Sequence, residues 1–102
     1  MVITILEARV ASEKAIQLEE AYKQAVERLD TGIVQTYLLR SKKDSNLWQI
    51  ATIWENQESL DAMRRSGETP RGVVIFRAAE AEASLQVFDL VAQGVALNYI
   101  RE

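Results

Sequence analysis

The chain has 102 residues and a net charge of -3; 48% of its residues are apolar and 26% are charged. This length predicts a single domain, and the negative charge argues against nucleic acid as a partner, because phosphate binding needs a basic surface. The sequence contains no cysteine and no histidine, which removes thiolate chemistry, the commonest general base near neutral pH and the commonest ligand of metals and haem. We therefore expect no metal site and no cofactor.

Membrane insertion and export are not expected either. No run of about 18 apolar residues occurs, which argues against a membrane-spanning helix. The sequence begins directly with a predicted strand and shows neither the charged segment nor the apolar core of a signal peptide. The expected location is the cytoplasm.

The first third of the chain predicts a strand followed by an amphipathic helix. Residues 2–10 are rich in β-branched side chains, which favour a strand. Ser12 is a candidate N-cap and Gly32 a candidate C-cap for the helix between them. Apolar residues recur along this helix at the spacing of one buried face, at Ala15, Leu18, Tyr22, Ala25 and Leu29.

Two further strands follow, joined by a loop. They are predicted over residues 33–40 and 47–55, and the polar residues 42–46 between them suit a hairpin. The second of these strands carries apolar side chains on both faces, with Trp48, Ile50 and Trp54 on one and Leu47, Ala51 and Ile53 on the other. The helices of so short a chain can cover one face of a sheet, so we expect a second copy of the chain to cover the other.

The second half of the chain predicts two helical segments and a last strand. Asn56 is a candidate N-cap for a helix with Leu60 and Met63 facing inward. Residues 66–72, with two glycines and the only proline, interrupt the helical pattern. Helical spacing returns over residues 73–83, where the inward positions are Val73, Phe76, Ala79 and Ala83. The last strand is predicted over residues 85–91.

This order, β-α-β-β-α-β, predicts an α+β fold, the ferredoxin-like sandwich of a four-stranded sheet with helices on one face. Two copies packed through their open sheet faces would form a dimeric α+β barrel, so the expected partner is a second copy of the chain in a homodimer. The domain is predicted to span residues 1–92. Residues 93–102 form a tail whose apolar residues, among them Leu97 and Ile100, predict docking on the domain or on the partner subunit.

The passage from the third strand into the second helix resembles a known family. It reads Ile53-Trp54-Glu55-Asn56-Gln57-Glu58-Ser59-Leu60 and is similar to the W-E-x-x-E-x-L passage of the antibiotic biosynthesis monooxygenase-like (ABM-like) family of dimeric α+β barrels. The strand order and element lengths agree with this resemblance. For function it implies several branches, which include cofactor-independent monooxygenases of polycyclic aromatics, haem-degrading oxygenases, quinol oxygenases and signal-processing proteins.

The haem-degrading branch does not carry over to this chain. Those enzymes have an asparagine near the end of strand one, and the matching residue here is Ala8. The tryptophan of their second helix is matched by Met63, and their histidine haem ligand falls near Val73. The resemblance therefore implies no haem degradation in its familiar form.

Four residues remain as candidates for a ligand pocket between helices and sheet, namely Tyr37, Trp54, Met63 and Phe76. The tryptophan could stack on an aromatic ring and the tyrosine could donate a hydrogen bond to a phenolate or carbonyl, but each of the four also fits core or interface packing. No catalytic residue is identified. Two functions stay open: a cofactor-independent monooxygenase of a planar aromatic or quinone-like small molecule, and a non-catalytic dimeric module for ligand binding or interaction.

Three charged residues in predicted strands need partners. Glu7 and Arg9 share one face of the first strand, and we expect them to pair with their counterparts on a second copy. Asp89 stands in an otherwise apolar last strand, and we expect Arg9 or Arg77 to pair with it if it is buried.

Overall fold

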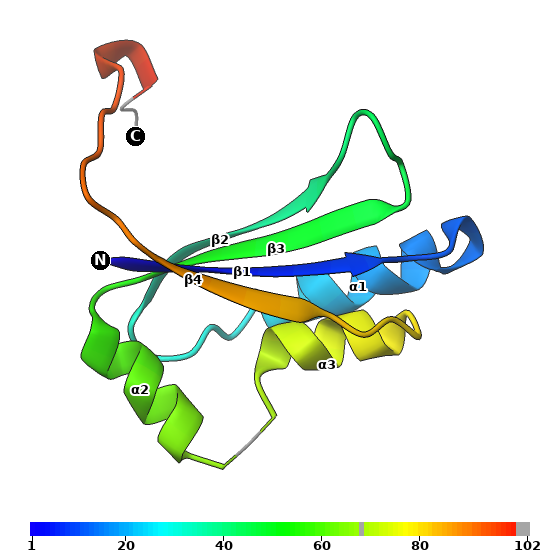
Figure 1. The fold of residues 1–102 in the computed structure, drawn as a ribbon, viewed down its shortest axis with the longest axis horizontal. Helices are drawn as coiled ribbons and strands as arrows, with labels where there is room; N and C mark the ends of the chain where they lie inside the picture. Colours follow the sequence, from blue (N-terminus) through cyan, green and yellow to red (C-terminus); the bar gives the residue numbers. More distant parts are fainter. Residues whose placement is uncertain (68, 100–102) are drawn as a thin grey trace.

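The computed structural model describes residues 1–67 and 69–99. One antiparallel sheet carries helices on one of its faces (Figure 1). The strands, in the sheet order β2-β3-β1-β4, are β1 (Val2–Arg9), β2 (Ile33–Arg40), β3 (Leu47–Trp54) and β4 (Ser84–Asp89). The helices are α1 (Ala15–Ala25), α2 (Gln57–Arg65) and α3 (Arg71–Ala78), with short 3-10 turns η1 (Ser12–Lys14) and η2 (Leu97–Tyr99). The predicted α+β ferredoxin-like fold is confirmed, with its second helical region divided at the predicted break.

The two faces of the sheet differ in what covers them. Alternation along β3 buries Trp48, Ile50 and Trp54 beneath the helices and turns the residues between them to the opposite side, here called the open face. The predicted two-sided strand is therefore confirmed. Through the strand register, the apolar residues of the open face are Ile3, Ile5, Tyr37, Leu39, Leu47, Ala51, Ile53 and Phe88.

A one-residue bulge changes the phase of β2. Ile33 and Gln35 pair with successive residues of β3, so Val34 is an extra residue in the ladder. Ile33 packs beneath the helices. Beyond the bulge, Thr36 takes the side that faces the helices and Tyr37 turns to the open face.

The core lies between the helices and the sheet in two clusters. The larger one contains the fully buried Leu18 of α1 and Phe76 of α3. The smaller one joins Leu60 of α2 to Trp54 and Val2 at the other end of the sheet. α2 is thus anchored separately from α1 and α3, which leaves room between the clusters.

Of the three predicted helix caps, one is confirmed. Asn56 begins α2, and its side-chain oxygen accepts a hydrogen bond from Ser59 N at 2.8 Å. Ser12 is not an N-cap, because it begins η1 after Ala11 and α1 then follows without a side-chain cap. Gly32 does not cap α1, which ends at residue 25; with φ at +94° it forms the turn into β2.

The last helix is shorter than predicted. Residues 73–83 were expected to be helical, but α3 ends at Ala78 because Glu80 adopts a left-handed φ of 59°. The backbone N–H of Ala81 then donates to Phe76 O at 3.0 Å, the closing hydrogen bond of a Schellman-type helix end.

Asp89 is exposed and needs no buried partner, so the ion pair considered for it does not form. The reason is that β4 is an edge strand, and every one of its residues is exposed. Arg9 instead hydrogen-bonds Asp44 of the β2–β3 hairpin, and this bond holds the pKa of Asp44 below its ordinary value. Arg77 pairs with Glu82 at 3.5 Å.

After β4 the chain extends away from the body of the domain (Figure 1). Val91 and Leu97 are 92% and 85% exposed, so this part of the tail is not packed on its own domain. Ile100 lies outside the described residues. Docking of the tail on a partner subunit stays a prediction. Among the helices of the described chain, none is both long and apolar enough to cross a membrane.

Candidate ligand-binding cavity

A cavity of about 170 Å³ lies between the helices and the sheet. It occupies the space where the two core clusters part, so residues of both line it. A mainly apolar cavity with a few polar groups is typical of small-molecule sites. Its apolar walls include Leu6, Ile33 and Ile50 from the sheet, Val26 and Leu29 from the segment after α1, Leu60 and Met63 from α2, and Val73 and Ile75 from α3.

Two buried threonines give the cavity a polar floor. Thr4 and Thr52 lie opposite each other on β1 and β3 and are 8% and 9% exposed. Trp54 Nε1 donates a hydrogen bond to Thr4 Oγ1 at 3.1 Å. Thr52 Oγ1 lies 3.3 Å from Thr36 Oγ1, which accepts a hydrogen bond from Tyr22 OH at 3.5 Å. Hydrogen bonds of this kind satisfy polar groups that would otherwise be costly to bury.

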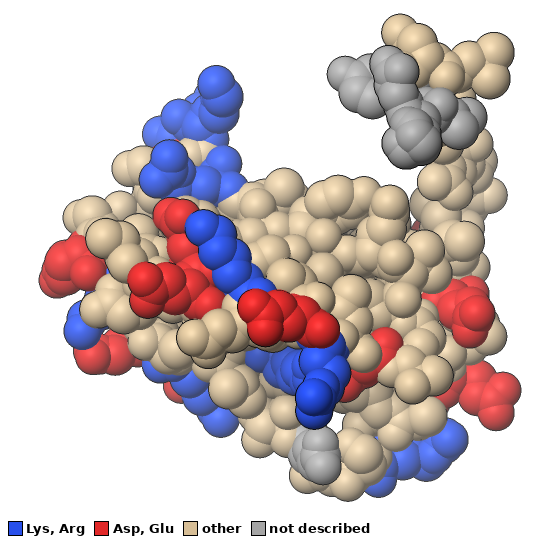
Figure 2. Space-filling view, turned by 180° about the vertical axis from the view of Figure 1, so that it is seen from behind, with Lys and Arg blue, Asp and Glu red and all other residues tan. Residues whose placement is uncertain are grey.

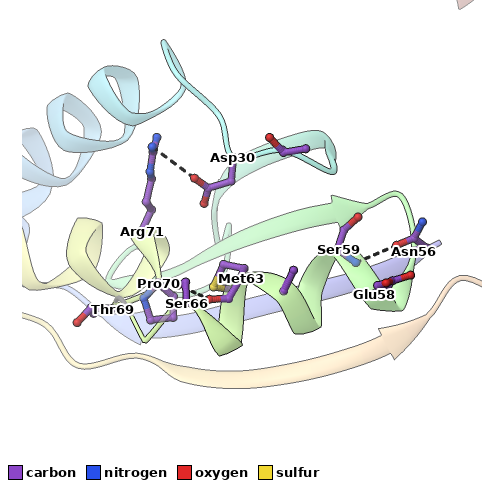
Figure 3. Close-up of a pocket in the computed structure, with 11 residues that line it drawn as sticks. Asp30, Asn56, Glu58, Ser59, Met63, Ser66, Thr69, Pro70 and Arg71 are labelled. Carbon is purple, nitrogen blue, oxygen red and sulfur yellow. Dashed lines mark hydrogen bonds and ion pairs between the residues drawn. The ribbon is translucent and has the colours of Figure 1, made fainter.

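The cavity adjoins an outer chamber of about 440 Å³ beside α2 (Figure 3). The walls of this chamber are more polar, with Asn56, Glu58 and Ser59 from the start of α2. Four residues line both spaces, namely Asp30, Met63, Pro70 and Arg71. A ligand longer than the inner cavity therefore has a place for its outer part.

An ion pair joins the two sides of the boundary between these spaces. Arg71 Nη2 lies 3.4 Å from Asp30 Oδ1 (Figure 3). Nη1 of the same side chain donates to Arg28 O. These contacts connect the start of α3 to the loop between α1 and β2. Arg64 also lines the inner cavity, so the described lining holds two cations and one carboxylate, a balance that favours an electron-rich or anionic ligand.

The structure brings two of the four predicted pocket residues to the cavity. Trp54 and Met63 line it. Phe76 is fully buried in the larger core cluster and fills space instead of lining it. Tyr37 lies on the open face, 45% exposed, because of the bulge in β2, and its OH donates to Gln35 Oε1 at 2.8 Å.

Sequence reasoning missed the two threonines and the Arg71–Asp30 pair. A signal for the threonines was present, since Thr4 and Thr52 stand at inward positions of strands that are otherwise apolar. The ion pair had no local signal, because it joins residues that are distant in the sequence. In the part of the chain that the structure describes, no three His, Cys, Asp or Glu side chains gather to hold a metal ion. Val73, which the resemblance was expected to place near the haem ligand of the haem-degrading branch, lines the cavity with an alkyl side chain.

Comparison with known proteins identifies the family. The family model of antibiotic biosynthesis monooxygenases matches residues 1–81, whereas no curated protein matches the sequence. A solved variant of MhuD with two manganese protoporphyrin IX molecules bound per active site is 21% identical, with a TM-score of 0.71 over 94% of this chain and 100% of that one. SnoaB, a cofactor-independent oxygenase from Streptomyces nogalater, is 17% identical, with a TM-score of 0.65 over 94% and 96%. A conserved protein from Methanosarcina mazei Go1 is 17% identical, with a TM-score of 0.65 over 86% and 91%.

At these identities the likeness to solved structures concerns the fold. The family model is the more specific finding, because it spans β1 through α3 and ends just before β4. The cavity between the helices and the sheet lies largely within the matched region. The chain belongs to the antibiotic biosynthesis monooxygenase family.

Proposed function

We propose that this protein is a cofactor-independent monooxygenase that acts on a planar aromatic or quinone-like small molecule. The observation that carries the proposal is the cavity, which combines apolar walls, the indole of Trp54 and two buried hydroxyl groups. SnoaB, which shares the fold, is a cofactor-independent oxygenase, and this supports the same reaction class here.

In such a reaction the substrate supplies the electrons. A reduced aromatic with an acidic methylene group loses a proton, and the resulting carbanion reduces dioxygen. The methylene carbon becomes a carbonyl, one oxygen atom stays in the product and the other leaves as water (CH2 + O2 → C=O + H2O). The protein's contribution is to exclude water, to hold the ring and to stabilise the developing negative charge.

A non-catalytic dimeric ligand-binding or interaction module is the second candidate. One observation favours it: Asp30, the carboxylate of the described cavity lining, is paired with Arg71, and the chain has no histidine. A general base needs a free acceptor within reach of the proton it removes. If Asp30 stays paired when ligand binds, binding is possible but proton removal is not assisted.

Oxygen uptake and ligand binding together separate these candidates. An anthrone is added to the protein in an oxygen electrode, and the rate is compared with its spontaneous oxidation; fluorescence quenching measures binding of the anthraquinone. Uptake of one O2 per product supports the monooxygenase, and binding without uptake supports the module. If neither oxygen uptake nor binding is observed, both candidate functions are contradicted.

A matched pair of variants tests whether the cavity is responsible. Ala25→Phe places a ring on the lining where α1 ends and is expected to abolish uptake and binding. Ala78→Phe makes the same change at an exposed position of α3 and should leave both unchanged. Equal effects of the two variants would contradict a site in this cavity.

We also propose that the protein is a homodimer packed through its open faces. The support is the row of apolar side chains on that face, which none of the helices in the described part of the chain covers. Figure 2 shows a largely uncharged surface between the β2–β3 hairpin and the C-terminal segment. At one end of the open face Gln49 Nε2 donates to Glu7 Oε1 at 2.7 Å, and pairing of Glu7 and Arg9 with a second copy stays a prediction, as does the cytoplasmic location.

Sedimentation velocity tests the dimer. Ile53→Glu puts a charge among the apolar side chains of the open face and is expected to give folded monomers, whereas Gln24→Glu, at an exposed position of α1, should sediment as the dimer. A monomeric unmodified protein, or a dimeric Ile53→Glu variant, would contradict the proposal.

A further inference from the structure

The polar floor of the cavity carries an inference about the ligand, and this inference rests on the proposed function. Thr4 and Thr52 are the buried polar residues of the described chain, and both line the cavity. They are direct partners in the β1–β3 ladder and lie on the same face. Side chains paired in this way have Cβ atoms about 5 Å apart, so a single atom resting on the sheet can be reached by both hydroxyl groups.

The hydrogen bond already made by Thr4 leaves its hydroxyl proton available. The indole N–H of Trp54 only donates, so Thr4 Oγ1 is the acceptor in that 3.1 Å contact. Thr4 makes this one side-chain hydrogen bond within the described residues. A hydroxyl can donate as well as accept, and the free space next to this one is the cavity.

A chain of hydroxyl groups allows Thr52 the same polarity. Tyr22 OH donates to Thr36 Oγ1 at 3.5 Å, and the Thr36 and Thr52 hydroxyl oxygens lie 3.3 Å apart, where either group can be the donor. When Thr36 donates, Thr52 accepts from the protein and, among the described residues, has no second side-chain partner for its own proton. Thr4 is thus held as an acceptor on the protein side, and with Thr36 as donor both threonines offer a proton to the cavity.

We propose that Thr4 and Thr52 form a two-donor site for an oxygen atom of the ligand, and that the ligand is an aromatic compound whose carbonyl, phenolate or enolate oxygen rests on the sheet between them. Two convergent donors match an oxygen atom that only accepts hydrogen bonds. A methyl or ring C–H group in the same place would leave both hydroxyl protons without an acceptor. Arg64 and Arg71 in the same lining favour the ionised form of that oxygen.

The dimensions of the two spaces agree with this orientation. An inner cavity of about 170 Å³ is close to the roughly 150 Å³ that accommodates one benzene ring in a protein core. The oxygen-bearing ring of a fused system therefore fits the inner cavity, and its remaining rings lie toward Met63 and the outer chamber of about 440 Å³. In the monooxygenase reaction the two hydroxyl groups would stabilise the anion that reduces dioxygen.

The test uses two one-ring probes that differ in a single group, 4-nitrophenol and 4-nitrotoluene, with binding followed by fluorescence quenching. We expect the unmodified protein to prefer 4-nitrophenol and to lower its apparent pKa, read from the visible absorption of the phenolate. Thr4→Val and Thr52→Val keep the side-chain shape and should each weaken 4-nitrophenolate binding about tenfold or more while leaving 4-nitrotoluene binding unchanged.

Three controls keep the result interpretable. Thr4→Ser and Thr52→Ser retain the hydroxyl and should restore the preference even if the valine variants are less stable. Ser45→Ala removes a hydroxyl group at an exposed position of the β2–β3 hairpin, outside the lining of both spaces, and should have no effect. Equal affinity for the two probes, absence of binding, or valine variants that keep the preference would overturn the inference. Neither probe is oxidised in this assay, so its result does not depend on whether the protein consumes oxygen. Failure of the monooxygenase proposal in the oxygen-uptake assay can therefore be distinguished from failure of this inference.

Discussion

Replacing Gly32 should show how tightly the loop before β2 is packed on α2. Gly32 has φ at +94°, and its carbonyl accepts a hydrogen bond from Glu55 N at 2.8 Å. A Cβ at this position would lie 2.5 Å from both Cβ and Oγ of Ser59, and 3.7 Å from its Cα. The left-handed backbone costs a residue with a side chain about 1–2 kcal/mol. The overlap adds about 1–3 kcal/mol, because α2 has to move away.

The expected loss of unfolding free energy for Gly32→Ala is therefore about 2–5 kcal/mol, measured by urea unfolding at one fixed protein concentration. A second substitution separates the two causes. Ser59→Gly removes both close atoms and leaves the ordinary 3.7 Å contact, so the double variant should recover the part that comes from overlap. Ser59→Ala keeps the Cβ and should not. Additive effects of Gly32→Ala and Ser59→Gly, within about 0.5 kcal/mol, would refute the packing argument.

Three further outcomes are expected. Asn56→Ala removes the cap of α2 and should cost about 1 kcal/mol of unfolding free energy, while Asn56→Asp should be nearly neutral; equal losses would contradict the cap. Phe76→Ala empties a fully buried site and should cost about 3–5 kcal/mol by the same measurement, and a loss below 1 kcal/mol would show that this part of the core can collapse. Since the hydrogen bond from Arg9 lowers the pKa of Asp44 from 3.8, the stabilisation is present above that value and is lost as pH falls through the folded-state pKa. Asp44→Asn should flatten the stability curve in this acidic range, and parallel curves would contradict the pairing.

The sheet could be predicted from the sequence because alternation records which face of a strand is buried. β2 was predicted with its observed bounds, and β3 and β1 within one residue, since Trp48, Ile50 and Trp54 share a face. The helix ends were harder, because long-range contacts decide them. Val26 and Leu29 continue the apolar pattern of α1, but they leave the helix to line the cavity.

The cavity was predicted between the right layers, but only half of its predicted residues lie there. Trp54 and Met63 follow from simple periodicity in unbroken elements. Tyr37 was expected to face the pocket but lies on the open face, because the bulge at Val34 shifts the alternation of β2. The bulge depends on pairing with β3, and valine favours a strand whichever face it points to, so the sequence alone does not mark the shift. Phe76 was correctly expected to face inward, but the difference between filling a core and lining a cavity depends on where α2 and α3 separate.

The extra residue in β2 also decides which side chains of this strand face the helices and which face the open side. If Val34 were deleted, Ile33 and Gln35 would become neighbours in a regular ladder and keep their partners Trp54 and Ile53, so Tyr37 would still face outward. If Val34 were instead retained in a strand without the bulge, the sides would reverse from Gln35 onward, and the phenol of Tyr37 would enter the interior in place of Thr36. The bulge therefore accommodates one additional residue without altering either surface of the subunit.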